Sequence, residues 1–235
     1  MDESIKEKET WDALRPRLSK GYGYNDDWEE AIKLFDTRIK KKFFTPVRTI
    51  IKNQELQGEG FAIVTVLCAL IESLASFRKG KIYSFYLGGL PSYYYSRSGE
   101  MVEKFLHTDD IFKNNFWIEG NDGKRKYDYP AKAKEFYSDV RCGLLHEART
   151  KGNWYINATK KDVKKETVFI EKRGEKMVIL RTVMFFRLKV CVTNYCQDLR
   201  NEKESFNELR KYFARKLDHI YGYDHTAKYD WWGDR

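Results

Sequence analysis

The chain has 235 residues, of which 42% are hydrophobic, 16% aromatic and 34% charged, so it can bury a core beneath a heavily solvated surface. This composition, without repeats or low-complexity tracts, excludes a fibrous or disordered protein and makes one domain over residues 1–235 the default. Lys and Arg number 44 against 35 Asp and Glu, and the net charge of +9 favours an anionic partner such as nucleic acid. Lys-rich surfaces can also be merely solubilising.

The sequence gives no sign of a membrane span, a secretory signal or a metal site. The longest apolar run, residues 61–71, is bounded by Glu59 and Glu72 and is too short to cross roughly 30 Å of hydrocarbon. Residues 1–6 lack the basic start and apolar core of a secretory signal. We therefore expect a cytoplasmic protein with no membrane partner, no metal and no cofactor. No CxxC pair occurs, which suits reduced thiols at Cys68, Cys142, Cys191 and Cys196.

Hydrophobic spacing predicts helices in the first third of the chain. Apolar residues recur every three to four positions after two aspartates, which predicts a helix over residues 27–42. Pro46 should bend or restart the chain, and a second helical segment should end near residues 57–60. Nearly every position from 61 to 77 is apolar, as expected of a central helix buried on most sides.

The middle of the chain is expected to alternate between loops and helices. Residues 79–100 are predicted to be mostly loop, and residues 93–95, all tyrosine, could stack bases or pack against the body. Helical spacing predicts a helix over 98–106, and glycines and asparagine predict a turn at 120–123. A further helix is predicted over 131–145.

The last third is predicted to combine a hairpin with two helices. Two apolar runs flank a charged, glycine-containing stretch, which predicts a small β-hairpin insertion at about residues 154–180. Helical periodicity returns over 183–199 and 206–220, before a polar and aromatic tail at about 221–235. The expected fold class is mainly α, a helical bundle with a small β-hairpin insertion.

The stretch from Arg141 to His146, with the sequence RCGLLH, carries the strongest chemical signal. Arginine offers a planar fork of donors that matches phosphate oxygens, and histidine can accept or donate a proton near neutral pH without a metal. RNA cleavage needs both kinds of side chain. In an ideal helix the two residues lie about 140° apart, because five residues turn by about 100° each. They converge only if the helix ends, as Gly143 would allow, or if a second copy contributes.

This motif resembles that of the HEPN domains, helical bundles that often act as metal-independent ribonucleases. The resemblance rests on Arg141-Cys142-Gly143-Leu144-Leu145-His146, which fits the family pattern of Arg, four to six residues and His after a helix. The residue after the arginine is most often Asn, Asp or His in that family, and Cys142 departs from this preference. The motif covers six residues, and the order of helices is loosely similar over about residues 27–220.

The resemblance implies a metal-independent endoribonuclease of toxin–antitoxin, abortive-infection or CRISPR-linked systems. Arg141 would hold the phosphate and His146 would act as general acid or base while the RNA 2′-OH attacks its own phosphate. The products would carry a 2′,3′-cyclic phosphate and a 5′-OH, and DNA, which lacks the 2′-OH, should survive. The resemblance also implies a homodimer in which both Arg and His pairs line one cleft, and a neutralising antitoxin.

Two carboxylates are expected to support the motif. Glu72 interrupts the apolar central helix, and a carboxylate there needs a cationic or hydrogen-bonding partner, which Arg141 could supply. The alternative is an ion pair that only holds two helices together. Glu147 follows the motif directly and could shape the cleft or merely be solvated.

Two other functional classes stay open. The chain could be a noncatalytic RNA- or nucleotide-binding module, to which the basic clusters at Lys40–Lys42 and 160–165 would contribute. It could also be a helical adaptor in which Arg141 pairs with Glu72 and His146 caps the helix end. Catalysis predicts that replacing the histidine abolishes cleavage with little loss of folding, whereas a structural role predicts a lowered melting temperature.

Overall fold

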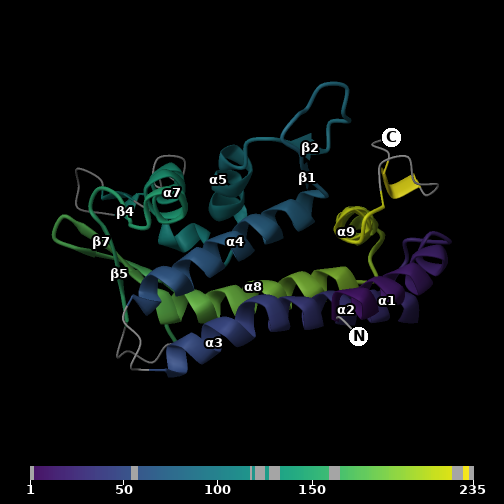
Figure 1. Ribbon diagram of the computed structural model, residues 1–235, viewed down its shortest axis with the longest axis horizontal. Coiled ribbons are helices and arrows are strands. Elements are labelled where there is room, and N and C mark those ends of the chain that lie inside the picture. The colour runs from purple at the N-terminus through teal and green to yellow at the C-terminus, as the bar shows by residue number, and fades with distance from the viewer. Residues whose placement is uncertain are drawn as a thin grey trace. The chain divides into compact units, whose positions relative to one another are not determined.

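The chain is mainly helical with a small sheet, as the sequence predicts (Figure 1). The computed structural model describes residues 3–53, 58–116, 118–119, 125–126, 133–158, 165–223 and 230–232. The chain divides into two compact units: unit 1 comprises residues 1–40, 73–96 and 192–235, and unit 2 comprises residues 41–72 and 97–191. The assignment of the whole chain to one domain stays a prediction.

Two long helices, α4 (Glu59–Lys79) and α8 (Arg181–Arg200), contribute residues to both units. Unit 1 also contains α1 (Glu3–Leu18), α2 (Asp26–Ile39), η4 (Glu204–Phe206), α9 (Asn207–Ile220) and η5 (Asp230–Trp232). The other helical segments are η1 (Lys40–Phe44), α3 (Thr45–Lys52), α5 (Gly99–Thr108), η2 (Lys113–Asn115), η3 (Phe136–Cys142) and α7 (Gly143–Glu147). The helices predicted around residues 27–42, 61–77, 98–106, 183–199 and 206–220 are thus confirmed.

The start of α2 and the segment before α3 show how local chemistry fixes the helix ends. The side chain of Asn25 accepts a hydrogen bond from the backbone N–H of Trp28 at 3.1 Å and so caps α2. The π-helical turn η1 follows, and Pro46 stands in the first turn of α3. A proline lacks the N–H of a regular helix and clashes with the carbonyl four residues before it, so a widened turn is expected at this point.

Helix α1 was not predicted. Its apolar residues are few, but Trp11, Leu14 and Leu18 follow helical spacing and are buried. The core of unit 1 is aromatic: the ring centroid of Phe35 lies 4.8 Å from that of Phe77 and 5.6 Å from those of Tyr195 and Phe213.

The core of unit 2 is a second aromatic cluster. The ring of Phe136 packs edge-on against Phe116 at 5.7 Å and against Trp154 at 5.8 Å, and it lies 6.5 Å from Phe169. Phe169 in turn contacts Phe112 at 6.2 Å. This cluster places η3 against the strands of the sheet and so fixes the helix that carries the motif.

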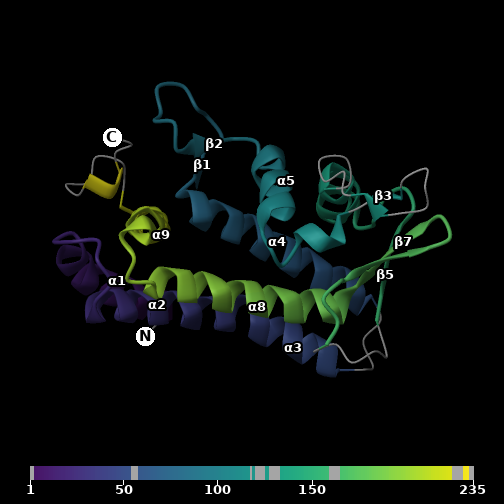
Figure 2. The ribbon, with the colours of Figure 1, turned by 180° about the vertical axis from the view of Figure 1, so that it is seen from behind.

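The predicted hairpin is present, and a third strand joins it. Strands β6 (Ile170–Arg173) and β7 (Lys176–Leu180) are antiparallel, and Gly174, with φ of 61°, supplies the positive φ of their two-residue turn. Strand β5 (Trp154–Asn157) pairs with β7 in parallel, giving the order β5-β7-β6 (Figure 2). Parallel pairing joins segments far apart in the sequence, so the hairpin pattern alone did not reveal it.

Two further strand pairs are short. Strands β1 (Ile82–Tyr83) and β2 (Tyr94–Tyr95) pair in parallel within the region predicted to be mostly loop. Strands β3 (Ile118–Glu119) and β4 (Arg125–Lys126) pair in antiparallel. They flank the predicted turn at residues 120–123, which lies outside the described residues.

Helix α4 is long and apolar enough to cross a membrane by length and composition alone. The tested window is 56% buried inside the protein, and a core helix meets the same criteria. Its buried side chains are those that the apolar pattern of residues 61–77 assigned to a central helix: Ile63, Val64, Leu67, Cys68, Leu70, Ile71, Leu74, Ala75 and Phe77.

Candidate functional site

The motif lies on one helical segment that begins before η3 and ends with α7. Residues 133–135 are helical, the backbone widens into π-helical turns in η3, and α7 continues to Glu147. Gly143 therefore does not end the helix, and the segment runs two residues beyond the predicted end at 145. Ala148 ends it with a positive φ of 55°.

Gly143 is required because the returning chain approaches it closely. A Cβ atom at this position would lie 2.6 Å from the carbonyl oxygen of Arg149. The N–H of Arg149 also donates to the carbonyl of Gly143 at 3.4 Å, and the N–H of Lys151 donates to the carbonyl of Asp139 at 2.8 Å. The glycine thus lets residues 149–151 turn back against the helix that carries the motif.

Arg141 is held by contacts on two sides. Its Nη2 donates to Oε2 of Glu72 at 2.7 Å, and both side chains are 20% exposed. Its guanidinium carbon lies 5.4 Å from the ring centroid of Tyr137, whose hydroxyl is 2.9 Å from that of Ser98. The ion pair anticipated between Arg141 and Glu72 is therefore present, and the arginine has a defined orientation.

The electrostatics keep Arg141 charged and leave part of its donor set unused. Burial disfavours the charge, but the carboxylate of Glu72 outweighs it and raises the pKa of the guanidinium. Besides the Glu72 bond, the described hydrogen bonds of this guanidinium include only a long contact from Nη1 to the sulfur of Cys142 at 3.9 Å. An arginine has five N–H donors, so several can still reach an anion.

His146 lies exposed on the last turn of α7. Within the described part of the chain it has no hydrogen bond or ion pair, and no contact joins it to Arg141. The carbonyl of Gly143 is capped by the backbone N–H groups of Ala148 and Arg149. The expected capping role of His146 in the adaptor hypothesis therefore has no counterpart at this carbonyl.

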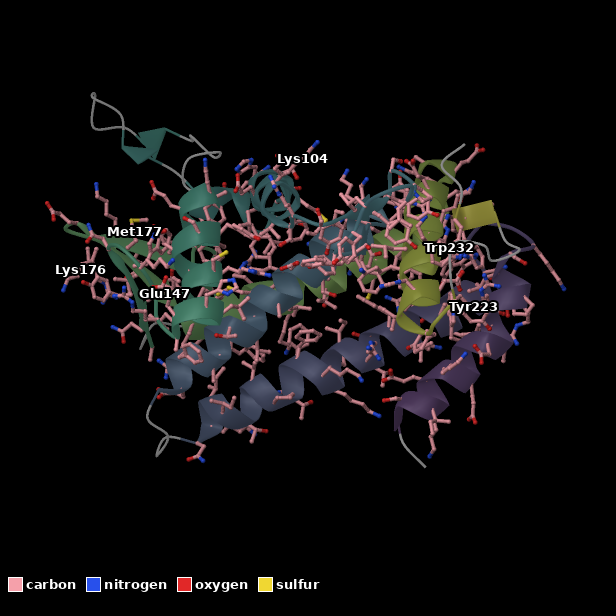
Figure 3. The ribbon with its side chains drawn as sticks, turned by 45° about the horizontal axis from the view of Figure 1, so that its top comes forward. Lys104, Glu147, Lys176, Met177, Tyr223 and Trp232 are labelled. Atoms are coloured by element: carbon pink, nitrogen blue, oxygen red, sulfur yellow. The ribbon has the colours of Figure 1, made fainter. Side chains whose placement is uncertain are left out.

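Glu147 contacts neither residue of the motif pair among the described interactions. Its carboxylate pairs with Nζ of Lys151 at 2.6 Å and with Nη2 of Arg149 at 3.5 Å, and it lies on the surface at the end of α7 (Figure 3). The hydrogen bond from Lys151 is the main cause that lowers the pKa of Glu147. The structure thus brings Glu72 to Arg141 and turns Glu147 toward the chain that follows the helix.

Other residues considered from the sequence have packing roles or lie outside the described region. Trp154 is buried against Phe136 with ring centroids 5.8 Å apart, so it packs in the core. Lys40–Lys42 are exposed on or beside η1, while most of the basic cluster at 160–165 lies outside the described residues. Among the residues that the structure describes, no three His, Cys, Asp or Glu side chains gather as a metal site would require.

Sequence reasoning did not find Ser98, because its hydroxyl reaches Tyr137 from another helix start, 39 positions away. No model of a known protein family, no curated protein sequence and no solved structure matches the chain.

Proposed function

We propose that the chain is a metal-independent endoribonuclease that uses Arg141 and His146. The observation that supports this most directly is their placement on one helical segment: a charged arginine with unused donors and, five residues further on, an exposed histidine. Glu72 and Tyr137 orient the arginine, which is the preparation that electrostatic catalysis needs.

The proposed reaction is an attack by the RNA 2′-oxygen on the adjacent phosphorus. The proton of the 2′-OH passes to a histidine acting as base, a bond forms between the 2′-oxygen and phosphorus, and the bond from phosphorus to the 5′-oxygen breaks. The leaving 5′-oxygen takes up a proton, which gives a 5′-OH and a 2′,3′-cyclic phosphate. Arg141 offsets the negative charge that develops on the phosphate oxygens.

The active form that we propose is a homodimer. The described contacts of Arg141 do not include His146, so a single copy does not present them as a joined pair. Two copies would supply one histidine as base and another as acid. Mixing inactive Arg141→Ala and His146→Ala chains tests this, because a mixed dimer should regain cleavage that neither variant shows alone.

Cleavage of a mixed-sequence RNA in EDTA tests the activity. His146→Ala should slow cleavage by about 10²- to 10⁴-fold, the usual contribution of a positioned proton transfer. The melting temperature should stay unchanged because the histidine is exposed. Product ends should be 2′,3′-cyclic phosphate and 5′-OH, and DNA of the same sequence should remain intact.

His219→Ala is the matched control, since His219 is also an exposed histidine on the last turn of its helix, α9. Wild-type protein that leaves RNA intact, or equal cleavage by wild type and His146→Ala, would contradict the proposal.

The ion pair between Arg141 and Glu72 favours a second candidate, an adaptor whose motif stabilises the bundle. A double-mutant cycle with Glu72→Ala and Arg141→Ala measures their coupling in the free energy of unfolding. Under the adaptor hypothesis Arg141→Ala lowers stability and the chain shows no RNA affinity. Under the ribonuclease hypothesis the same variant loses cleavage beyond what its lost stability explains.

The biological setting belongs to the same proposal: a cytoplasmic toxin or antiphage nuclease, restrained by a neutralising partner protein. Expression in cells should then arrest growth with the wild-type motif and not with His146→Ala.

A further inference from the structure

The loop between β1 and β2 exposes a run of aromatic and apolar side chains. Tyr83 is 50% exposed, Phe85 73%, Tyr86 78% and Leu87 43%. Figures 1 and 2 show the loop extending beyond the paired strands in both views. A protein surface seldom leaves consecutive large apolar side chains in water without a use for them.

The base of this loop is fixed, so these side chains are held in a defined place. The N–H of Ile82 donates to the carbonyl of Tyr93, and the N–H of Ser84 donates to that of Tyr95, both at 2.9 Å. Tyr93 is only 3% exposed and packs beneath Arg215, whose guanidinium carbon lies 4.3 Å from its ring centroid. Of the two uses considered for residues 93–95, Tyr93 thus shows packing against the body.

The exposed rings offer open faces. A ring with roughly three quarters of its surface exposed has at least one face in solvent, and both Phe85 and Tyr86 meet this condition. Their centroids are 4.9 Å apart with an interplanar angle of 81°, so they touch edge to face and do not cover each other. Each ring can therefore take a flat partner of its own.

The charges around the loop favour an anionic ligand. Residues 73–99 contain four cations, Arg78, Lys79, Lys81 and Arg97, and no Asp or Glu. Lys79 is exposed at the end of α4. Lys81 donates to the carbonyl of Ser92, which leaves two of its three donors for other acceptors. A ligand with both flat aromatic faces and phosphates matches this combination.

We propose that residues 83–87 form a stacking site for the bases of single-stranded nucleic acid, with Phe85 and Tyr86 each taking one base. The choice of RNA as ligand rests on the proposed ribonuclease function, whereas the stacking itself does not require the 2′-OH. Base stacking on an aromatic side chain is tolerant of sequence, which suits a surface that presents ring faces without hydrogen-bonding groups arranged for one base.

The test is binding of a fluorescent single-stranded RNA of about 12 nucleotides to the full chain in EDTA, in a His146→Ala background. Phe85→Leu and Tyr86→Leu keep an apolar side chain but remove the ring, and each should weaken binding by about 5- to 100-fold. Phe85→Tyr and Tyr86→Phe keep the ring and should bind as the parent does. Tyr155→Leu is the control, because Tyr155 is a 45% exposed aromatic on β5.

Three further arms separate base stacking from attraction to the phosphate backbone alone. An RNA of equal length with abasic positions should bind weakly and respond little to the leucine variants. A DNA strand should show the same preference for aromatic residues, because bases stack alike on either backbone. The salt dependence should be unchanged in the leucine variants, whereas Lys79→Gln should reduce its slope by about one.

The proposal is overturned if the leucine variants bind RNA as tightly as the parent, or if the abasic strand binds equally well. It is also overturned if the chain binds anionic lipid vesicles through this loop and the leucine variants retain that binding, since a bilayer accepts leucine as readily as a ring. The two proposals fail separately: a wild type that binds bases without cutting RNA contradicts only the nuclease, and cleavage with loop-independent binding contradicts only the stacking site.

Discussion

At the scale of single residues, the four cysteines differ sharply in their surroundings. Burial raises the pKa of the Cys68 thiol to about 12, and it does the same for Cys196. Cys191 is buried as well, while Cys142 is partly exposed next to Arg141. Because the thiolate is the reactive form, access and ionisation both favour Cys142.

Iodoacetamide at about pH 8 should therefore modify Cys142 first in the native protein. Peptide mass spectrometry after a short exposure should find the label on Cys142, and unfolding in urea should make all four thiols reactive. In Cys142→Ser, labelling of the native protein should fall nearly to zero. Equal rates at Cys68 and Cys142 would show that the helix carrying the motif opens readily.

Residue-level signals predicted part of the site and missed the rest for physical reasons. The apolar run around Glu72 indicated a carboxylate that needs a partner, and Arg141 is that partner. The sequence could not indicate that Gly143 continues the helix, because its role depends on a carbonyl from Arg149 that approaches after the chain reverses. The exposure of Phe85 and Tyr86 was likewise hidden, since nearby tyrosines of the same type are buried.

At the scale of elements, Gly143 shows how two segments pack. Alanine has a higher helix propensity than glycine, by about 1 kcal/mol, so an isolated helix would gain stability from Gly143→Ala. Here the added Cβ would lie 2.6 Å from a backbone oxygen of Arg149, which cannot move without shifting residues 149–151.

We expect Gly143→Ala to lower the free energy of unfolding by about 1–3 kcal/mol, as overpacking does. Urea denaturation measures the change. Gly23→Ala is the matched control, because a Cβ at Gly23 meets no atom within 4 Å. A Gly143→Ala protein as stable as wild type would mean that the returning chain is not held against the helix.

Helices α2 and α8 are joined in unit 1 by a two-pronged ion pair. Arg200 donates from Nε and Nη2 to the two carboxylate oxygens of Glu29, at 2.7 and 3.0 Å. These bonds are the main reason that the pKa of Glu29 lies below its ordinary value of 4.5. A carboxylate whose pKa is lower in the folded state stabilises the fold above its unfolded pKa, and this contribution disappears as the pH falls through the folded pKa.

Arg200→Gln should consequently lower the melting temperature near neutral pH and have little effect in acid. The pair is partly exposed, so a loss of about 0.5–1 kcal/mol is expected at pH 7. Thermal melts from neutral pH to below the lowered pKa of Glu29 should show the difference between variant and wild type shrinking. A difference that is the same across this range would show that Arg200 acts through packing and not through the charge of Glu29.

The elements follow from the sequence where their patterns are long and local. Helices α4 and α8 each carry about five turns of apolar residues, and both were predicted. The parallel pairing of β5 with β7 and the burial of Trp231 and Trp232 depend on partners far along the chain. A tail that its composition marked as polar and aromatic therefore proved to include two core residues.

At the scale of the whole chain, a single buried carboxylate joins the N-terminal helix to the end of the described chain within unit 1. Asp218, fully buried on α9, accepts hydrogen bonds from the indoles of Trp11, Trp231 and Trp232 at 2.9, 2.5 and 2.6 Å. Arg15 of α1 adds two charge-assisted bonds at 2.6 and 2.9 Å. Residues that are 207 positions apart in sequence thus meet at one acid.

Asp218→Asn should destabilise the protein strongly, because it removes the negative charge that balances the buried Arg15 and turns an amide donor toward other donors. Removing one partner of a buried pair costs about 3–5 kcal/mol, which urea denaturation can measure. Tryptophan emission should shift to the red as the indoles lose their buried partner. Asp36→Asn, which breaks the more exposed pair with Lys40, should cost less than about 1 kcal/mol. Equal stability of Asp218→Asn and wild type would show that indole packing alone holds these segments together.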